Sequence, residues 1–128
     1  MKRTYPEYEL QKAFYKYLNL KHSELLYMSD TIANLGLTPQ QQGRNKAIQK
    51  EGFHCPDVII FEPRGGCHGL FIELKVVKPY KKDGTLKKNE HLENQMQTIL
   101  DLRKRGYCAN FATGFNEAVE QLESYLSL

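Results

Sequence analysis

Two carboxylates and an ammonium lie in the middle of the chain at a spacing that a short hairpin would close. Asp57 precedes an apolar run rich in β-forming residues at 58–61, Glu73 belongs to a second such run at 70–74, and Lys75 directly follows that run. A Pro-Arg-Gly-Gly turn sequence separates the two runs, which predicts an antiparallel hairpin. In that hairpin Asp57 comes within about one residue of standing opposite Glu73, and Lys75 shares the strand face of Glu73.

Charged side chains on a half-buried sheet cost folding free energy unless an oppositely charged group or a metal ion pairs with them. Carboxylate oxygens of Asp57 and Glu73 are ligands of the kind that Mg²⁺ takes, and the main-chain carbonyl of Leu74 would supply a third. Lys75 would then stabilise charge on a phosphoryl oxygen or orient a water. The pattern indicates metal-dependent phosphodiester hydrolysis, although a solvent-facing strand end with a Glu–Lys pair is the simpler alternative.

A helix predicted over Thr4–Asn19 could carry a further carboxylate towards the hairpin. Glu7 lies at the edge of its apolar face, one turn from Gln11, and Glu9 on the opposite flank is the rival candidate. A glutamate in a first turn is also favoured by capping and by the helix dipole alone, so both interpretations stay open.

Two more polar residues are candidates for the same site. Gln95 borders the buried stripe of a helix predicted over Glu90–Arg105, where it could reach the site or simply be a boundary residue. His54 lies close in sequence to Asp57, but a lone loop histidine usually has no such role.

Basic residues concentrate in two stretches that could contact phosphates. From Lys75 to Lys88 the chain carries six lysines and one acid, with Tyr80 interleaved, directly after the predicted metal site. A charge run of this kind is usually a solvated loop, but beside a phosphodiester-cleaving centre it would neutralise flanking phosphates. The second stretch is a helix predicted over Pro39–Glu51. The candidate nucleic-acid contacts are Arg44, Lys46, Lys50, Lys78, Lys81, Lys82, Lys87 and Lys88.

Length and composition predict one domain, residues 1–128, with a single core. The net charge of +3 is mild, and no run approaches the ~18 apolar residues of a membrane span. The N-terminus lacks the apolar stretch of a secretory signal. Cys55, Cys67 and Cys108 are odd in number and show no CxxC spacing, so reduced thiols in a cytoplasm are expected rather than zinc or disulfides.

The remaining predicted elements complete an alternating order. A short strand is predicted at Leu25–Met28, Val76 and Val77 are expected to extend the strand that carries Glu73, and a last strand and helix are predicted at Tyr107–Phe111 and Phe115–Leu126. The order is helix, strand, helix, strand, strand, helix, strand, helix. This predicts an α/β fold with a small mixed sheet flanked by helices.

The constellation Pro56-Asp57…Glu73-Leu74-Lys75 resembles the active-site motif of the PD-(D/E)xK nuclease superfamily. Nearly the whole chain resembles a stand-alone VRR-NUC (virus-type replication–repair nuclease) domain, a module whose minimal members are often phage-encoded. Glu7 to Gln11 looks like the first-helix pattern E-x-x-L-Q, which favours Glu7 over Glu9. The other matching features are the helix that ends in a glycine at Lys46–Gly52, Gln95, and Gly106 before the last strand. The chain departs from the family in one place, because Phe53-His54-Cys55 replaces the usual glycine before Pro-Asp.

The resemblance implies a restriction-endonuclease-like core and a Mg²⁺- or Mn²⁺-dependent DNA nuclease. Asp57, Glu73, the Leu74 carbonyl and Glu7 would serve the metal, with Lys75 and Gln95 beside it. Minimal members resemble Holliday junction resolvases and act as homodimers, so branched DNA and a second copy of the chain are the expected partners, with no membrane. A restriction-type, flap or single-strand nuclease on the same fold and a catalytically silent DNA-binding subunit are the alternatives.

Overall fold

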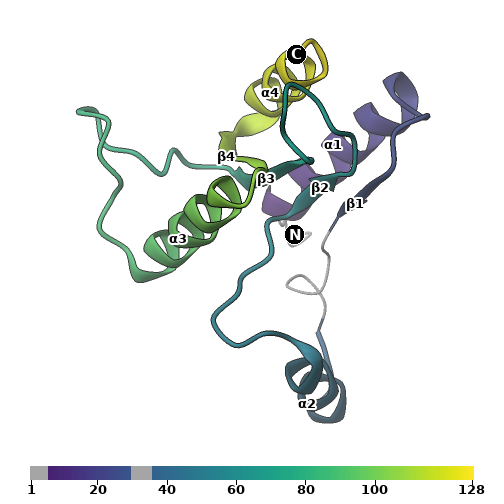
Figure 1. The fold of residues 1–128 in the computed structure, drawn as a ribbon. Helices are drawn as coiled ribbons and strands as arrows, with labels where there is room; N and C mark the ends of the chain where they lie inside the picture. The colour runs from purple at the N-terminus through teal and green to yellow at the C-terminus, as the bar shows by residue number, and fades with distance from the viewer. Residues whose placement is uncertain (1–5, 30–35) are drawn as a thin grey trace, which may run out of the picture.

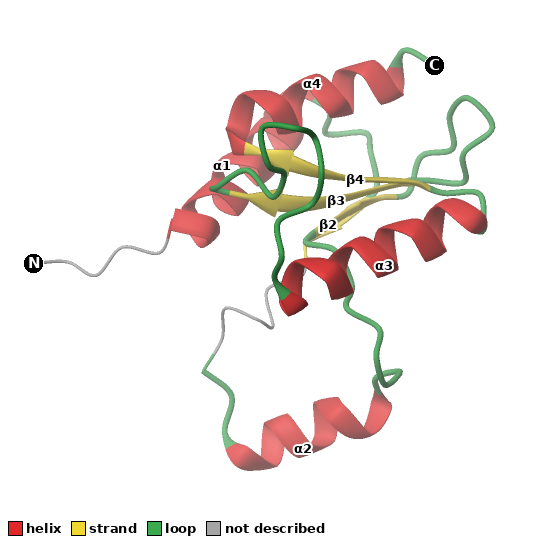
Figure 2. Ribbon diagram, turned by 90° about the vertical axis from the view of Figure 1, so that its left-hand side faces the viewer, coloured by secondary structure: helices red, strands yellow, loops and turns green. Residues whose placement is uncertain are grey.

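A mixed sheet with helices on both faces forms the body of the molecule in this computed structural model, which describes residues 6–29 and 36–128 (Figures 1 and 2). The sheet order is β1-β2-β3-β4; the first two pairings are antiparallel and β3 pairs with β4 in parallel. The predicted α/β fold with a small mixed sheet is therefore confirmed. The elements are α1 (Pro6–Lys21), β1 (Tyr27–Ser29), α2 (Pro39–Ile48), β2 (Val58–Ile60), β3 (Leu70–Lys75), α3 (Glu90–Lys104), β4 (Cys108–Thr113) and α4 (Gly114–Leu126).

The hairpin of β2 and β3 has the predicted turn. Arg64 and Cys67 exchange backbone hydrogen bonds of 3.1 and 2.8 Å across Gly65 and Gly66. Both glycines have positive φ, 54° and 84°, as the tight hairpin turns with two left-handed residues require. The pairing places Val58 opposite Ile72. One residue further along, just before β2 begins, the same register puts Asp57 opposite Glu73.

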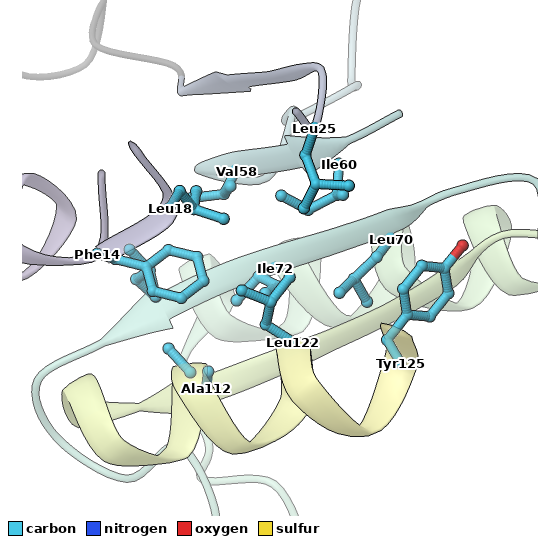
Figure 3. Packing of buried hydrophobic residues seen from close by; sticks show 12 residues of the cluster. Phe14, Leu18, Leu25, Val58, Ile60, Leu70, Ile72, Ala112, Leu122 and Tyr125 are labelled. Atoms are coloured by element: carbon cyan, nitrogen blue, oxygen red, sulfur yellow. The ribbon is translucent and has the colours of Figure 1, made fainter. Parts of the chain in front are cut away.

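Two hydrophobic clusters hold the sheet between its helices. The larger one lies between the sheet and the pair α1 and α4, and Figure 3 shows Phe14, Ile72 and Leu122 packing within it. The smaller one lies under α3 and contains Ile99, Leu102 and Phe111. Residues of β3 alternate between the two, because successive side chains of a strand point to opposite faces. Leu70, Ile72 and Leu74 join the larger cluster, and Phe71 packs against the smaller one.

Several predicted boundaries are wrong. β3 ends at Lys75, and Val76 and Val77 are exposed rather than part of the strand. α2 ends at Ile48, three residues early, because its C-cap Gln49 is already extended. β1 begins at Tyr27 instead of Leu25. The predicted cap Thr4 lies outside the described residues.

The expectation of reduced thiols is also wrong for two cysteines. Cys67, in the hairpin turn, and Cys108, the first residue of β4, form a disulfide with a Cα–Cα distance of 5.8 Å. The hairpin turn lies beside the start of β4, where the Cys108 N–H donates to the Gly69 carbonyl at 3.0 Å. The two cysteines are 41 residues apart, so their spacing gave no sign of this pairing. Cys55 takes no part in this disulfide.

Within the described part of the chain, none of the helices combines the length and the apolar character needed to cross a membrane.

Candidate metal centre and active site

A cleft of about 470 Å³ gathers the predicted site residues from four parts of the fold. Glu7 comes from the first turn of α1, Asp57 from the approach to β2, Glu73 and Lys75 from the end of β3, and Gln95 from the middle of α3. Leu74 lies between the two β3 residues and also lines the cleft. The structure thus brings together every residue predicted to serve the metal or the reaction, while their roles stay predictions.

Backbone and side-chain donors hold the two carboxyl groups in place. Oδ2 of Asp57 accepts a hydrogen bond of 2.8 Å from the Leu74 N–H, so the carboxyl bridges from one strand of the hairpin to the other. Oε1 of Glu73 accepts a 2.9 Å bond from Nε2 of Gln95. Gln11 of α1 donates to the Asp57 carbonyl at 3.2 Å. Each carboxyl therefore has a fixed orientation before any ligand binds.

The two carboxyl groups resist ionisation in the absence of a cation. Burial, then the negative charge of Asp57 and a hydrogen bond to it, raise the pKa of Glu73 to about 9. Burial also raises the pKa of Asp57, although its bonds to Glu73 and to the Leu74 N–H oppose this shift. Both shifts favour the uncharged form of a carboxyl group when no cation is bound.

This donor set fits a hard divalent cation. A divalent cation bound to both carboxylates would remove the repulsion between them. Oε1 of Gln95 is buried and has no hydrogen-bond partner within the part of the chain that the structure describes. Among the described residues no group of three or more His, Cys, Asp or Glu side chains is arranged to hold an ion. The other two predicted ligands, Leu74 and the exposed Glu7, line the same cleft.

Lys75 is buried beside these carboxyl groups. Its positive charge favours the ionised forms of Asp57 and Glu73 and so opposes, without cancelling, the rise in the pKa of both groups. Its Nζ lies 5.9 Å from the centroid of the Phe111 ring on β4. A desolvated ammonium beside the carboxyl pair is suited to stabilise negative charge on a third, incoming group.

Two histidines and two residues of α2 also line the cleft. His91 was missed by the sequence analysis, although it lies one helical turn before Gln95 and this spacing could have indicated a shared face. His54, a weak candidate from its position in the sequence, lies in the cleft wall. Asn45 and Gln49 are contributed by α2 and its cap, and Figures 1 and 2 show α2 as a separate projection from the body.

The candidate phosphate-binding residues fall into two groups. Arg44, Lys46 and Lys50 are exposed on α2 and just after it. The other group belongs to the segment after β3, which is largely exposed and forms a small hairpin of its own through the Tyr80–Leu86 bridge. Lys78, Lys81 and Lys82 line a hollow of about 380 Å³ together with Phe111, Lys88 is exposed and Lys87 is half-buried. Phe111 connects this hollow to Lys75.

A mixed four-stranded sheet between helices, with Pro-Asp before one hairpin strand and Glu-Leu-Lys at the end of the next, defines an α/β domain. A solved structure described as a "VRR_NUC domain protein" has the same fold, with a TM-score of 0.62. The match covers 99% of this chain and 93% of that chain at 24% sequence identity. The VRR-NUC-like fold predicted from the motifs is therefore confirmed. No protein-family model matches the sequence, and no curated protein is similar to it at a significant level.

Proposed function

We propose that the protein is a metal-dependent DNA nuclease that hydrolyses phosphodiester bonds in the cleft described above. The observation that carries the proposal is the Asp57–Glu73 pair, in which a half-buried and a buried carboxyl group lie opposite each other and are each held by an N–H donor. A purely structural role would not favour two opposed acids in a half-buried position. Binding a cation would give the two acids a functional role, because the cation compensates their negative charges.

Mg²⁺, or Mn²⁺ in its place, would be held by Asp57, Glu73 and the Leu74 carbonyl, and it would supply an activated water and charge stabilisation at the phosphate. Lys75 places an ammonium where a non-bridging phosphate oxygen would gain negative charge. Gln95 orients Glu73 and offers its free Oε1 to a water. Glu7 adds negative charge at the rim, which helps to attract a cation.

For the oligomeric state and the substrate, we propose a homodimer that acts on branched DNA, with a four-way junction as the preferred substrate. One chain offers one carboxylate cleft, and cutting two strands of a junction requires two. A two-fold symmetric dimer would supply them and would double the basic surface of α2 and of the Lys78–Lys88 segment. We place this activity in the cytoplasm, although the Cys67–Cys108 disulfide removes part of the argument from reduced thiols.

The test is a Mg²⁺-dependent cleavage assay on duplex, single-stranded, flap and four-way-junction DNA, with Asp57→Ala and Glu73→Ala as inactive variants. We expect each substitution to lower the cleavage rate by about 100-fold or more, as loss of a group that stabilises transition-state charge does. Glu93→Ala, which replaces an exposed glutamate of α3, is the matched control. Full activity in either cleft variant would refute the metal-site assignment.

The same assay distinguishes a junction-cutting dimer from a flap or single-strand nuclease and from a silent DNA-binding subunit. Preference for the junction, together with a light-scattering mass about twice the 14.9 kDa of one chain, supports a dimeric, resolvase-like nuclease. A monomer that cuts flaps or single strands would refute the resolvase-like proposal and leave the nuclease proposal standing. DNA binding without cleavage under every metal condition would favour a silent DNA-binding subunit.

A further inference from the structure

A second hollow, of about 300 Å³, lies beside the outer face of α1 and the end of β1. Tyr8, Lys12, Tyr15 and Lys16 line it together with Gln11 and Ser29. We call it the α1 groove. None of the predicted phosphate-binding residues belongs to it.

Helical spacing places the lining side chains of α1 on one face. Tyr8, Lys12 and Tyr15 follow each other at intervals of four and three residues, and Lys16 is four residues after Lys12. Both tyrosines are large and exposed, with 41% and 46% of their surface accessible. Two aromatic rings and two ammonium groups thus alternate along about 10 Å of helix, roughly seven residues at 1.5 Å each.

The orientation of Tyr15 is fixed within the fold. Its ring packs edge-on against that of Tyr27 in β1, with 5.8 Å between the centroids. A ring held in this way loses little side-chain entropy when a flat group stacks on it. At the bottom of the groove, Oγ of Ser29 is buried and has no hydrogen-bond partner.

The α1 groove and the carboxylate cleft lie on neighbouring parts of α1. Gln11 lines the groove and donates a hydrogen bond to the Asp57 carbonyl. Glu7 and Met28 line the cleft, and the next residue in each element, Tyr8 and Ser29, lines the groove. The groove is therefore close enough to the cleft to receive nucleotides next to a phosphate bound there.

The groove is complementary to single-stranded DNA. All the charged side chains that line it within the described residues are lysines, which suits phosphates. Exposed aromatic rings stack on unpaired bases, whose faces are free, whereas the bases of a duplex are already stacked on each other. The distance of about 10 Å between the tyrosines corresponds to two or three nucleotides at about 3.4 Å each.

We infer that the α1 groove binds the unpaired strand that flanks the scissile phosphate, by stacking bases on Tyr8 and Tyr15 and by pairing phosphates with Lys12 and Lys16. This inference rests on the proposed nuclease function and adds the class of DNA that the site accepts. Tailed and flapped substrates present such a strand, and a four-way junction presents one only where base pairs open at its crossover.

The test measures binding in EDTA, so that cleavage plays no part. Fluorescence anisotropy would compare a labelled single strand of about 12 nucleotides with the corresponding duplex. We expect Tyr8→Ala and Tyr15→Ala each to weaken single-strand binding about tenfold, with less than about a twofold effect on the duplex. Tyr8→Phe, which keeps the ring, should restore binding. Lys12→Ala with Lys16→Ala should reduce the slope of log K against log salt by about 0.7 for each phosphate that is no longer neutralised.

Lys21→Ala with Lys104→Ala, which replaces a pair of exposed lysines at the ends of α1 and α3, is the matched charge control. Equal losses for single strand and duplex, equal losses in the charge control, or no loss at all would each overturn the inference. A change in light-scattering mass caused by Tyr8→Ala would also overturn it, because it would assign the groove to a second copy of the chain. If single-strand binding behaves as expected but no metal supports cleavage, the nuclease proposal fails and the binding groove stands.

Discussion

Gln95 of α3 donates a buried hydrogen bond of 2.9 Å to Glu73 at the end of β3, although the two residues are 22 positions apart in the chain. The bond fixes one oxygen of the carboxyl group, and the remaining amide oxygen of Gln95 stays buried and unpaired. Gln95 thus connects the helix that covers one face of the sheet to the carboxyl pair that lies across the hairpin.

Removing this hydrogen bond is expected to weaken metal binding without unfolding the protein. Gln95→Ala releases Glu73 from its fixed orientation, and loss of a residue that orients a metal ligand typically costs about 10–100-fold in metal affinity or activity. Calorimetric titration with Mn²⁺ checks the prediction. Gln97→Ala, which replaces an exposed glutamine two residues along α3, is the control. An unchanged Mn²⁺ affinity would assign Gln95 to packing alone.

The carboxyl pair makes the stability of the metal-free protein depend on pH. The pKa of Glu73 is about 9 in the folded protein and near 4.5 in the unfolded chain. The unfolded chain therefore releases the proton first, so the contribution of Glu73 to stability is complete below about pH 4.5 and is lost as the pH rises towards 9. Thermal unfolding in EDTA should show a falling Tm over this range.

Glu73→Gln keeps a neutral group in the folded protein at every pH. We expect it to raise the Tm of the metal-free protein at about pH 8 and to flatten this part of the pH profile, by roughly 4 °C or more if the gain is about 1 kcal/mol. Addition of Mg²⁺ should stabilise the unsubstituted protein more than this variant, because the cation needs the ionised carboxylate. A lower Tm for the variant at that pH would contradict the raised pKa of Glu73 in the folded protein.

The lysines after β3 are expected to bind phosphates without reading sequence. Replacing Lys81, Lys82 and Lys88 with alanine should weaken duplex binding for all sequences and flatten the slope of log K against log salt by up to about 0.9 for each lysine that neutralises a phosphate. The binding constant measured from about 50 to 200 mM salt on two unrelated duplexes checks this. An unchanged slope would leave the segment as a solvated hairpin.

The disulfide joins the hairpin turn to β4 and should contribute strongly to stability. Cys67→Ser with Cys108→Ser opens a loop of 41 residues, and loss of such a cross-link typically costs about 2–4 kcal/mol. Unfolding in urea with and without a reductant measures the loss. Cys55→Ser, which leaves the Cys67–Cys108 bond in place, is the control and should cost less stability. Reductant should have no effect on the double variant.

The sequence by itself determined the hairpin and the main helices, because their signals are local. Two apolar runs of β-forming residues and the glycine pair between them set the two strands and their turn, so the opposition of Asp57 and Glu73 could be predicted. Apolar residues at helical spacing predicted α1, α3 and α4 to within a few residues. The fold follows from these elements and from the confirmed resemblance.

Only the tertiary structure decided which segments distant in the chain lie against each other. Parallel pairing of β3 with β4 brings Cys108 to the hairpin turn and makes the disulfide, which the number and spacing of cysteines argued against. The docking of α3 places Gln95 and His91 over the carboxyl pair. The approach of α1 to β1 forms the groove of Tyr8 and Tyr15. Each of these depends on which faces pack together, and side-chain packing across the sheet is not encoded in the periodicity of any one element.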